Sequence, residues 1–108
     1  GYAIVHQFCT VGSYSFCAMG SAVNKDIPAF VRVRGNPAKP YGINTVGMKR
    51  LGYSPRAIEA LRSAYRSTYR KNLTIEEALR EMKPLEAKHK EVKLFSKTVK
   101  KSSRGIVR

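Results

Sequence analysis

The sequence has few acidic residues, little cysteine and no long hydrophobic run. Of its 108 residues only seven are Asp or Glu, against 21 Lys or Arg, so the formal net charge is +14. No stretch approaches the roughly 20 consecutive apolar residues that a membrane-spanning helix requires, and no signal peptide is visible. We therefore expect no membrane span.

The two cysteines, Cys9 and Cys17, do not have the spacing of a metal site. No third or fourth metal ligand clusters with them in the sequence. We therefore expect no metal, and two reduced thiols of the kind found in a cytoplasmic protein.

The positive charge is unevenly distributed along the chain. Gly1–Val31 carries only Lys25 and Asp26 as charged residues, whereas the chain from Arg32 onward is strongly cationic. The change marks an architectural boundary near residue 31. A positive field of this size favours an anionic partner, which could be nucleic acid, an acidic protein, a membrane surface or a phosphorylated small molecule. A basic surface that only confers solubility is the alternative.

A period of six residues organises the first 27 positions. One aliphatic or thiol residue recurs every sixth position, and a small residue stands two places before each. The members are Val5, Val11, Cys17 and Val23, with Ala3, Cys9, Ser15 and Ser21 before them. This period is typical of a left-handed parallel β-helix, in which three hexapeptides form one coil with the larger residue inside. The alternative is a chance period in a strand-rich region.

This repeat is too short to be stable alone. It fills fewer than two coils, and repeat units of this kind need about three or more neighbours to bury their apolar faces. The chain begins within the pattern and without Met. We therefore expect a C-terminal piece of a longer β-helix protein, with the coils ending near Pro28 because proline cannot donate to a strand ladder.

The rest of the chain predicts short elements in a mixed β-then-α fold. Asn44 and the Ser54-Pro55 pair are helix starts, and Thr74 with Glu77 is a capping box. Pro37 and Pro40 predict a loop over Gly35–Gly42. The expected elements are a strand at 29–34 and helices at 45–51, 54–70, 74–82, 85–89 and 91–101, followed by a basic tail in which Ile106 and Val107 can dock. We divide the chain into a β-helix end (1–31), an extended linker (32–43) and a helical domain (44–108).

Three arginines in the longest helix share one face. Arg62, Arg66 and Arg70 lie four residues apart. This face lies away from an apolar stripe formed by Ile58, Leu61, Tyr65 and Tyr69.

Several segments together carry a specific resemblance to a known family. They are His6-Gln7-Phe8-Cys9, Lys25-Asp26-Ile27-Pro28, Gly35-Asn36-Pro37-Ala38, Gly42-Ile43-Asn44, Gly47-Met48-Lys49-Arg50 and the ending Ser103-Arg104-Gly105-Ile106-Val107-Arg108. In this order and spacing they resemble the C-terminal part of the acyl-carrier-protein:UDP-N-acetylglucosamine O-acyltransferases, which catalyse the first step of lipid A synthesis. The resemblance covers essentially the whole chain.

The resemblance implies a homotrimer with active sites between subunits. Such enzymes move an R-3-hydroxyacyl chain from the phosphopantetheine thioester of acyl carrier protein to the 3-hydroxyl of UDP-N-acetylglucosamine, with a His as general base and no metal or other cofactor. That His lies upstream of this sequence in the family. We therefore expect no catalytic residue in this chain, which should be inactive alone.

The resemblance also assigns substrate-binding residues. His6, Gln7, Asn44 and Arg50 match family residues that line the nucleotide-sugar site. The family commonly has Glu at the position of Val46 and Arg at the position of Leu51, so two charges near that site are missing here.

We also expect acyl carrier protein to dock on Arg62, Arg66 and Arg70. Acyl carrier proteins are strongly acidic, and a basic face can steer them by long-range attraction. Two alternatives stay open. One is a basic helical module that binds nucleic acid or an anionic membrane, although no zinc spacing or recognition helix supports it. The other is a different hexapeptide-repeat acyltransferase.

Overall fold

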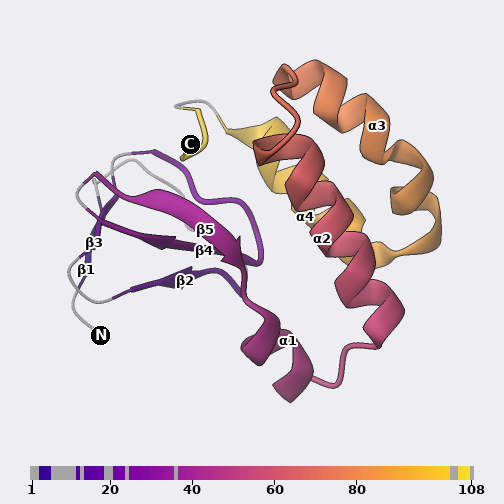
Figure 1. Ribbon diagram of the computed structural model, residues 1–108, viewed down its shortest axis with the longest axis horizontal. Coiled ribbons are helices and arrows are strands. Elements are labelled where there is room, and N and C mark those ends of the chain that lie inside the picture. The colour runs from indigo at the N-terminus through magenta and orange to yellow at the C-terminus, as the bar shows by residue number, and fades with distance from the viewer. Residues whose placement is uncertain are drawn as a thin grey trace.

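The computed structural model describes residues 3–5, 12, 14–18, 21–23, 25–35, 37–102 and 105–107. Short strands form one end of the molecule and helices the other, and the C-terminus returns to the strand end (Figure 1). The predicted inner positions Val5 and Val23 lie in strands whose side chains are outside the described part, and Val11 lies outside it altogether.

Parallel pairing of strands supports the hexapeptide coil. Strand β1 (Ala3–Val5) pairs in parallel with β3 (Ser21–Val23), and Ala3 lies opposite Ser21, 18 residues along the chain. Three hexapeptides span that distance, so successive coils stack in the register that the period of six predicts.

The next coil is shorter. Strand β2 (Phe16–Cys17) pairs in parallel with β4 (Val31–Arg34), and Phe16 lies opposite Arg32, 16 residues along. The six-residue period is therefore interrupted before β4, as Pro28 predicts. Cys17 is half-buried and packs against the core, which agrees with its predicted inner position.

The predicted loop over Gly35–Gly42 is wrong from Lys39 onward, because β5 (Lys39–Ile43) is a strand antiparallel to β4, whereas Gly35, Pro37 and Ala38 lie in turns. Its three-stranded sheet has the order β2-β4-β5, which puts β5 at an edge. Pro40 is tolerated there because an edge strand can carry a residue without an N–H group on its unpaired side.

The first two helices begin where the sequence predicts. Helix α1 (Thr45–Arg50) is capped by Asn44, whose side chain accepts a hydrogen bond from the Gly47 N–H. Helix α2 (Pro55–Tyr69) is capped by Ser54.

The predicted break between the helices at 74–82 and 85–89, where Pro84 lies, is wrong. Helix α3 (Ile75–Lys88) starts with the predicted Thr74–Glu77 capping box and passes through Pro84, and His89 is its C-cap. Met82 is fully buried before the proline, and Leu85 packs against the core after it. Packing on both sides therefore outweighs the lost backbone hydrogen bond. Helix α4 (Lys90–Lys101) follows directly.

The C-terminal tail is fixed to the last coil. Ile106 forms a parallel bridge with Asp26, and the Val107 N–H donates to the Asp26 carbonyl at 2.8 Å. Ile106 and Val107 are both buried, so the predicted docking of the tail is confirmed.

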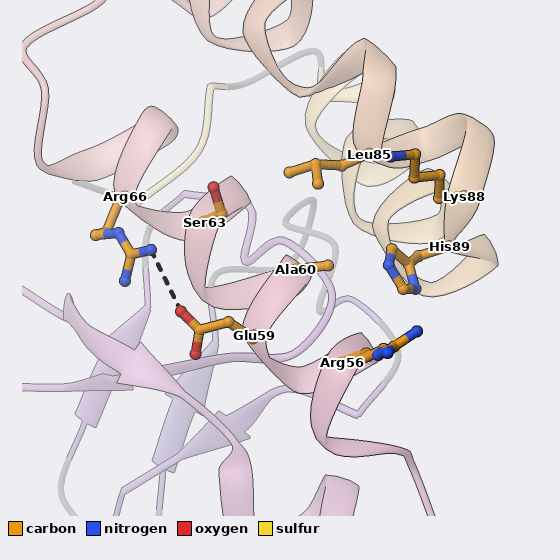
Figure 2. Close-up of a pocket in the computed structure, with 8 residues that line it drawn as sticks. All are labelled: Arg56, Glu59, Ala60, Ser63, Arg66, Leu85, Lys88 and His89. Atoms are coloured by element: carbon orange, nitrogen blue, oxygen red, sulfur yellow. Dashed lines mark ion pairs between the residues drawn. The ribbon is translucent and has the colours of Figure 1, made fainter.

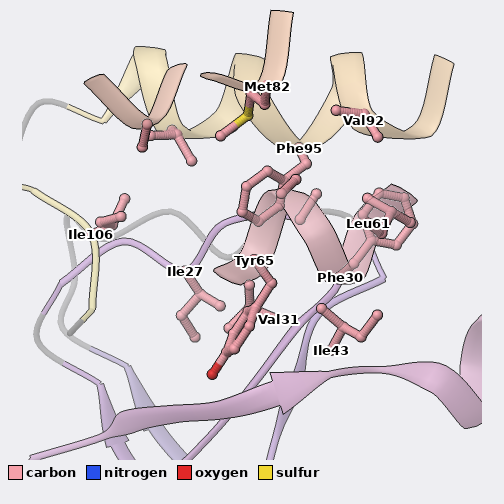
Figure 3. Packing of buried hydrophobic residues seen from close by; sticks show 14 of the residues in the cluster. Ile27, Phe30, Val31, Ile43, Leu61, Tyr65, Met82, Val92, Phe95 and Ile106 are labelled. Carbon is pink, nitrogen blue, oxygen red and sulfur yellow. The ribbon is translucent and has the colours of Figure 1, made fainter. Parts of the chain in front are cut away.

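One hydrophobic cluster joins the strand end to the helices (Figure 3). Ile27 and Val31 come from the last coil, Leu61 from α2, Met82 from α3 and Phe95 from α4. The helices therefore gain stability by packing on one another and on the strands, as short helices require. The division of the chain at residues 31 and 43 stays a prediction.

Candidate functional site

The structure describes two of the four expected nucleotide-sugar residues. Asn44 immediately precedes α1, and Arg50 ends it. His6 and Gln7 lie outside the described residues. The grouping of the four around one ligand therefore stays a prediction.

Asn44 joins two segments that are distant in sequence. Its Oδ1 accepts from the Gly47 N–H at 3.1 Å, and its Nδ2 donates to the Tyr14 carbonyl at 3.0 Å. A Cβ at Gly47 would lie 2.5 Å from Nδ2, so only glycine leaves room for this side chain. A carboxamide has two donor hydrogens and two acceptor lone pairs, so half of its capacity stays open to a ligand.

Beside Asn44 lies an aromatic cluster that the sequence analysis did not identify. The Tyr14 ring stacks on Phe30 with ring centroids 5.6 Å apart, and Tyr53 meets both rings edge-on. Phe30 is fully buried, whereas Tyr14 is 48% exposed. The cluster therefore anchors the Tyr14 segment to the core while leaving a ring surface open next to Asn44.

Arg50 is exposed at the last turn of α1, where a cation is favourable to the helix dipole. The two positions at which the resemblance led us to expect charged residues are exposed too, with Val46 at 58% and Leu51 at 52%. Charged side chains at these positions would reach solvent or a ligand, so the substitutions change the surface and not the core.

The expected docking arginines are all exposed on α2. Arg66 forms an ion pair with Glu59 at 3.5 Å, and the Arg70 guanidinium lies 5.8 Å from the centre of the Tyr65 ring. Burial raises the pKa of the Tyr65 hydroxyl, and the nearby charges of Arg70 and Arg32 oppose that rise.

A groove of about 660 Å³ lies beside this face, between α2 and the end of α3 (Figure 2). Its floor includes Ala60 and Leu85, with Leu85 pointing toward α2. Its rim is mostly basic and includes Arg56, Lys88 and His89. The groove could not be predicted from separate helices at 74–82 and 85–89, because it is the continuous α3 that brings Leu85 and Lys88 alongside α2.

A second, smaller cavity of about 250 Å³ lies on another side of α2, where this helix meets the sheet. Among the residues that the structure describes, seven line it: Arg32, Gly42, Ile43, Thr45, Arg62, Tyr65 and Arg66.

Among the described residues, no group of three or more His, Cys, Asp or Glu side chains could hold a metal ion. No helix in the described part is long and apolar enough to cross a membrane.

Comparison with known proteins decides the family. The model of the family described as UDP-N-acetylglucosamine O-acyltransferase, domain 2, matches residues 26–107. The chain belongs to this family.

Curated proteins of the family are similar along the whole chain. The acyl-[acyl-carrier-protein]–UDP-N-acetylglucosamine O-acyltransferase of Stutzerimonas stutzeri is 50% identical over all 108 residues, and that of Pseudomonas putida is 47% identical. In both cases this chain spans 42% of the relative's length.

Solved structures of the UDP-N-acetylglucosamine O-acyltransferase family share the fold. LpxA from Acinetobacter baumannii is 38% identical with a TM-score of 0.95. The matched region includes 98% of this chain and 42% of the Acinetobacter baumannii chain. The UDP-N-acetylglucosamine O-acyltransferase from Moraxella catarrhalis is 42% identical with a TM-score of 0.94, and 98% of this chain covers 41% of it. The predicted fold class, closing coils of a left-handed β-helix followed by helices, is confirmed.

Proposed function

We propose that this chain is the C-terminal, substrate-binding part of an acyltransferase. The reaction moves an R-3-hydroxyacyl chain from acyl carrier protein to the 3-hydroxyl of UDP-N-acetylglucosamine, the first step of lipid A synthesis. The family match over residues 26–107 carries the proposal, together with relatives of that name that are about half identical along the whole chain.

In this proposal the chain binds and orients substrates. The general base that removes the proton from the attacking sugar hydroxyl belongs to a coil outside this chain, and no metal or other cofactor takes part. Asn44 offers an unused donor and acceptor to the nucleotide sugar, and Arg50 can form two parallel hydrogen bonds to a phosphate. His6 and Gln7 complete the nucleotide-sugar site.

The acidic carrier would dock on Arg62, Arg66 and Arg70. Their exposure and the basic rim of the adjoining groove support this assignment. Of the described residues that line the groove, only Glu59 carries a carboxylate, and Arg66 already pairs with it. An acidic protein therefore meets an almost uniformly positive surface.

The proposal includes assembly into a homotrimer, and a set of half-exposed apolar side chains supports it as a contact surface. Tyr14, Phe16, Val46 and Leu51 are each 48–58% exposed, and all four lie in or next to β2 and α1. Large apolar side chains grouped on a surface mark interaction sites. A cytoplasmic location stays a prediction.

A chimera tests the proposal. This chain would replace the matching 42% of the Stutzerimonas stutzeri enzyme, which then supplies the coils that this chain lacks. We expect turnover with acyl carrier protein and UDP-N-acetylglucosamine, whereas the truncated relative alone should be inactive. A chimera that folds and assembles but does not bind the UDP-sugar would refute the proposal. Nucleic-acid binding measured in parallel tests the alternative of a basic binding module.

A further inference from the structure

The smaller cavity is lined by three arginines from two elements that are distant in sequence. Arg32 comes from β4, and Arg62 and Arg66 come from α2. Thr45 also belongs to the lining, and its hydroxyl donates to the Ile43 carbonyl at 3.4 Å. None of the seven lining residues is acidic.

Arg32 is held in place on several sides. Its guanidinium carbon lies 4.7 Å from the centre of the Tyr41 ring, a cation–π contact. Gly42 lies opposite Arg32 in the sheet, and a Cβ at Gly42 would come within 3.2 Å of Arg32 Nη2. The glycine therefore leaves room for the guanidinium to lie beside the cavity. Arg32 Nε is buried and has no hydrogen-bond partner among the described residues.

The positive charges of this cavity are poorly compensated. Glu59 is the partner of Arg66 at 3.5 Å but does not line the cavity. Like charges grouped near a surface of reduced dielectric repel one another, and a bound anion relieves that repulsion. The arrangement thus favours an anion between β4 and α2.

Size and donor number select the kind of anion. At about 250 Å³ the cavity lies below the range of about 300–1,000 Å³ typical of sites for drug-sized ligands, so it accepts a small group. A phosphoryl group presents three oxygens, one for each guanidinium, whereas a carboxylate presents two. We propose that Arg32, Arg62 and Arg66 form a phosphoryl-binding pocket for inorganic phosphate or diphosphate, or for the terminal phosphate of a larger ligand.

This pocket is distinct from the expected nucleotide-sugar residues, since neither Asn44 nor Arg50 lines it. The proposal does not depend on acyl transfer, and it can hold or fail whether or not α2 docks a carrier.

The test titrates the full chain with inorganic phosphate, diphosphate and a simple alkyl phosphate at constant ionic strength. The arginine Nε–H signals are followed by nuclear magnetic resonance. We expect saturable shifts of the Arg32, Arg62 and Arg66 signals together, and tighter binding of the alkyl phosphate above about pH 6, where a phosphate monoester becomes doubly charged. A preference for the free ions identifies a phosphate or diphosphate site, and a preference for the monoester identifies an attached phosphate. Acetate that binds equally well would overturn the proposal.

Arg34 provides a matched control for Arg32. Both residues belong to β4, and both stack on Tyr41, with Arg34 at 4.6 Å, but Arg34 does not line the cavity. We expect Arg32→Gln to weaken phosphate binding about tenfold or more, and Arg34→Gln to change it less than about twofold.

Equal losses in the Arg32 and Arg34 variants would show diffuse attraction by the basic surface and would overturn the pocket. Circular dichroism checks that each variant is folded. If Arg32→Gln is not, Arg62→Gln replaces it, because Arg62 is exposed and its loss should leave the fold intact. The same loss of about tenfold is then expected, and unchanged binding would contradict the proposal.

Discussion

Asn44 combines two roles that can be separated. It caps α1 through Gly47 and ties the Tyr14 segment to that helix, and the proposed function adds contact with a nucleotide sugar. Ser54 caps α2 in the same way, by accepting from the Ala57 N–H at 3.1 Å, but has no proposed ligand. The two residues therefore form a natural pair for comparison.

We predict that Asn44→Ala and Ser54→Ala each lower the free energy of unfolding by about 1 kcal/mol, because each removes an N-cap acceptor. Only Asn44→Ala should also weaken UDP-N-acetylglucosamine binding. Urea unfolding and calorimetric titration of the chimera measure the two effects. Equal nucleotide-sugar affinity in the two variants would limit Asn44 to its structural role.

Local residues such as Asn44 could be predicted from the sequence, whereas Arg32 could not be assigned a site. A cap acts within one helical turn, so its residue type and position suffice to recognise it. The Arg32 cavity depends on β4 meeting α2 about 30 residues later, and no local pattern encodes that contact. His6 and Gln7 rest on resemblance alone, because they lie outside the described residues.

At the scale of the element, Pro40, which predicted a loop, and Pro84, which lies between two predicted helices, are both inside regular structure. Pro40 occupies the edge strand β5, and Pro84 lies within α3. The energetic cost of a proline is local, whereas the edge position of β5 and the burial of Met82, a residue of α3, depend on tertiary structure. The helix starts were predicted correctly because capping is itself local.

Pro84 should cost α3 stability. It is exposed and leaves the Arg80 carbonyl without its usual helical donor. We predict that Pro84→Ala raises the free energy of unfolding by about 1 kcal/mol or more, since an interior proline is about 3 kcal/mol less favourable than alanine before adaptation. Urea unfolding measures the gain, with Lys83→Ala as the control on the same exposed turn. A loss of stability would mean that the proline ring supports the fold.

Two carboxylates of α3 make the protein sensitive to acid. The pKa of Glu77 lies below its ordinary value of 4.5, because its carboxylate accepts hydrogen bonds from the Thr74 backbone and side chain. The pKa of Glu81 is lowered by hydrogen bonds from Lys71 and Ser67. The unfolded chain therefore takes up protons first on acidification. The contribution of these two carboxylates to the stability of the fold is fully present above about pH 4.5. It is lost as the pH falls through their lowered pKa values.

We predict that the melting temperature falls on acidification below about pH 4.5. The fall should be smaller in a Glu77→Gln/Glu81→Gln variant, which has no carboxylate to protonate at either position. Glu76→Gln, which keeps both carboxylates, is the matched control. Thermal unfolding followed by circular dichroism at each pH measures the difference. Identical profiles for all three proteins would contradict the prediction.

At the scale of the whole molecule, the helices close the end of the coils. Ile27 and Val31 belong to the same hydrophobic cluster as Leu61 and Phe95, and the tail at Ile106 returns to the last coil. This packing directs α2 across the strand end with its apolar stripe inward. The arginine face flanks this stripe: Arg62 and Arg66 are exposed where α2 meets the sheet, and Arg66 also lines the groove that α3 completes.

The net charge of +14 predicts how an acidic carrier approaches that face. Long-range attraction raises the association rate and is screened within about 10 Å at 0.1 M salt. In the chimera, we predict that kcat/KM for the carrier falls steeply with ionic strength. Arg62→Glu/Arg66→Glu should lower it further at low salt, mainly through KM for the carrier and with KM for the sugar nucleotide unchanged. Lys93→Glu/Lys97→Glu on α4 removes the same charge elsewhere and serves as the control. If both double variants lose activity equally, or if turnover is indifferent to salt, α2 is not the docking face.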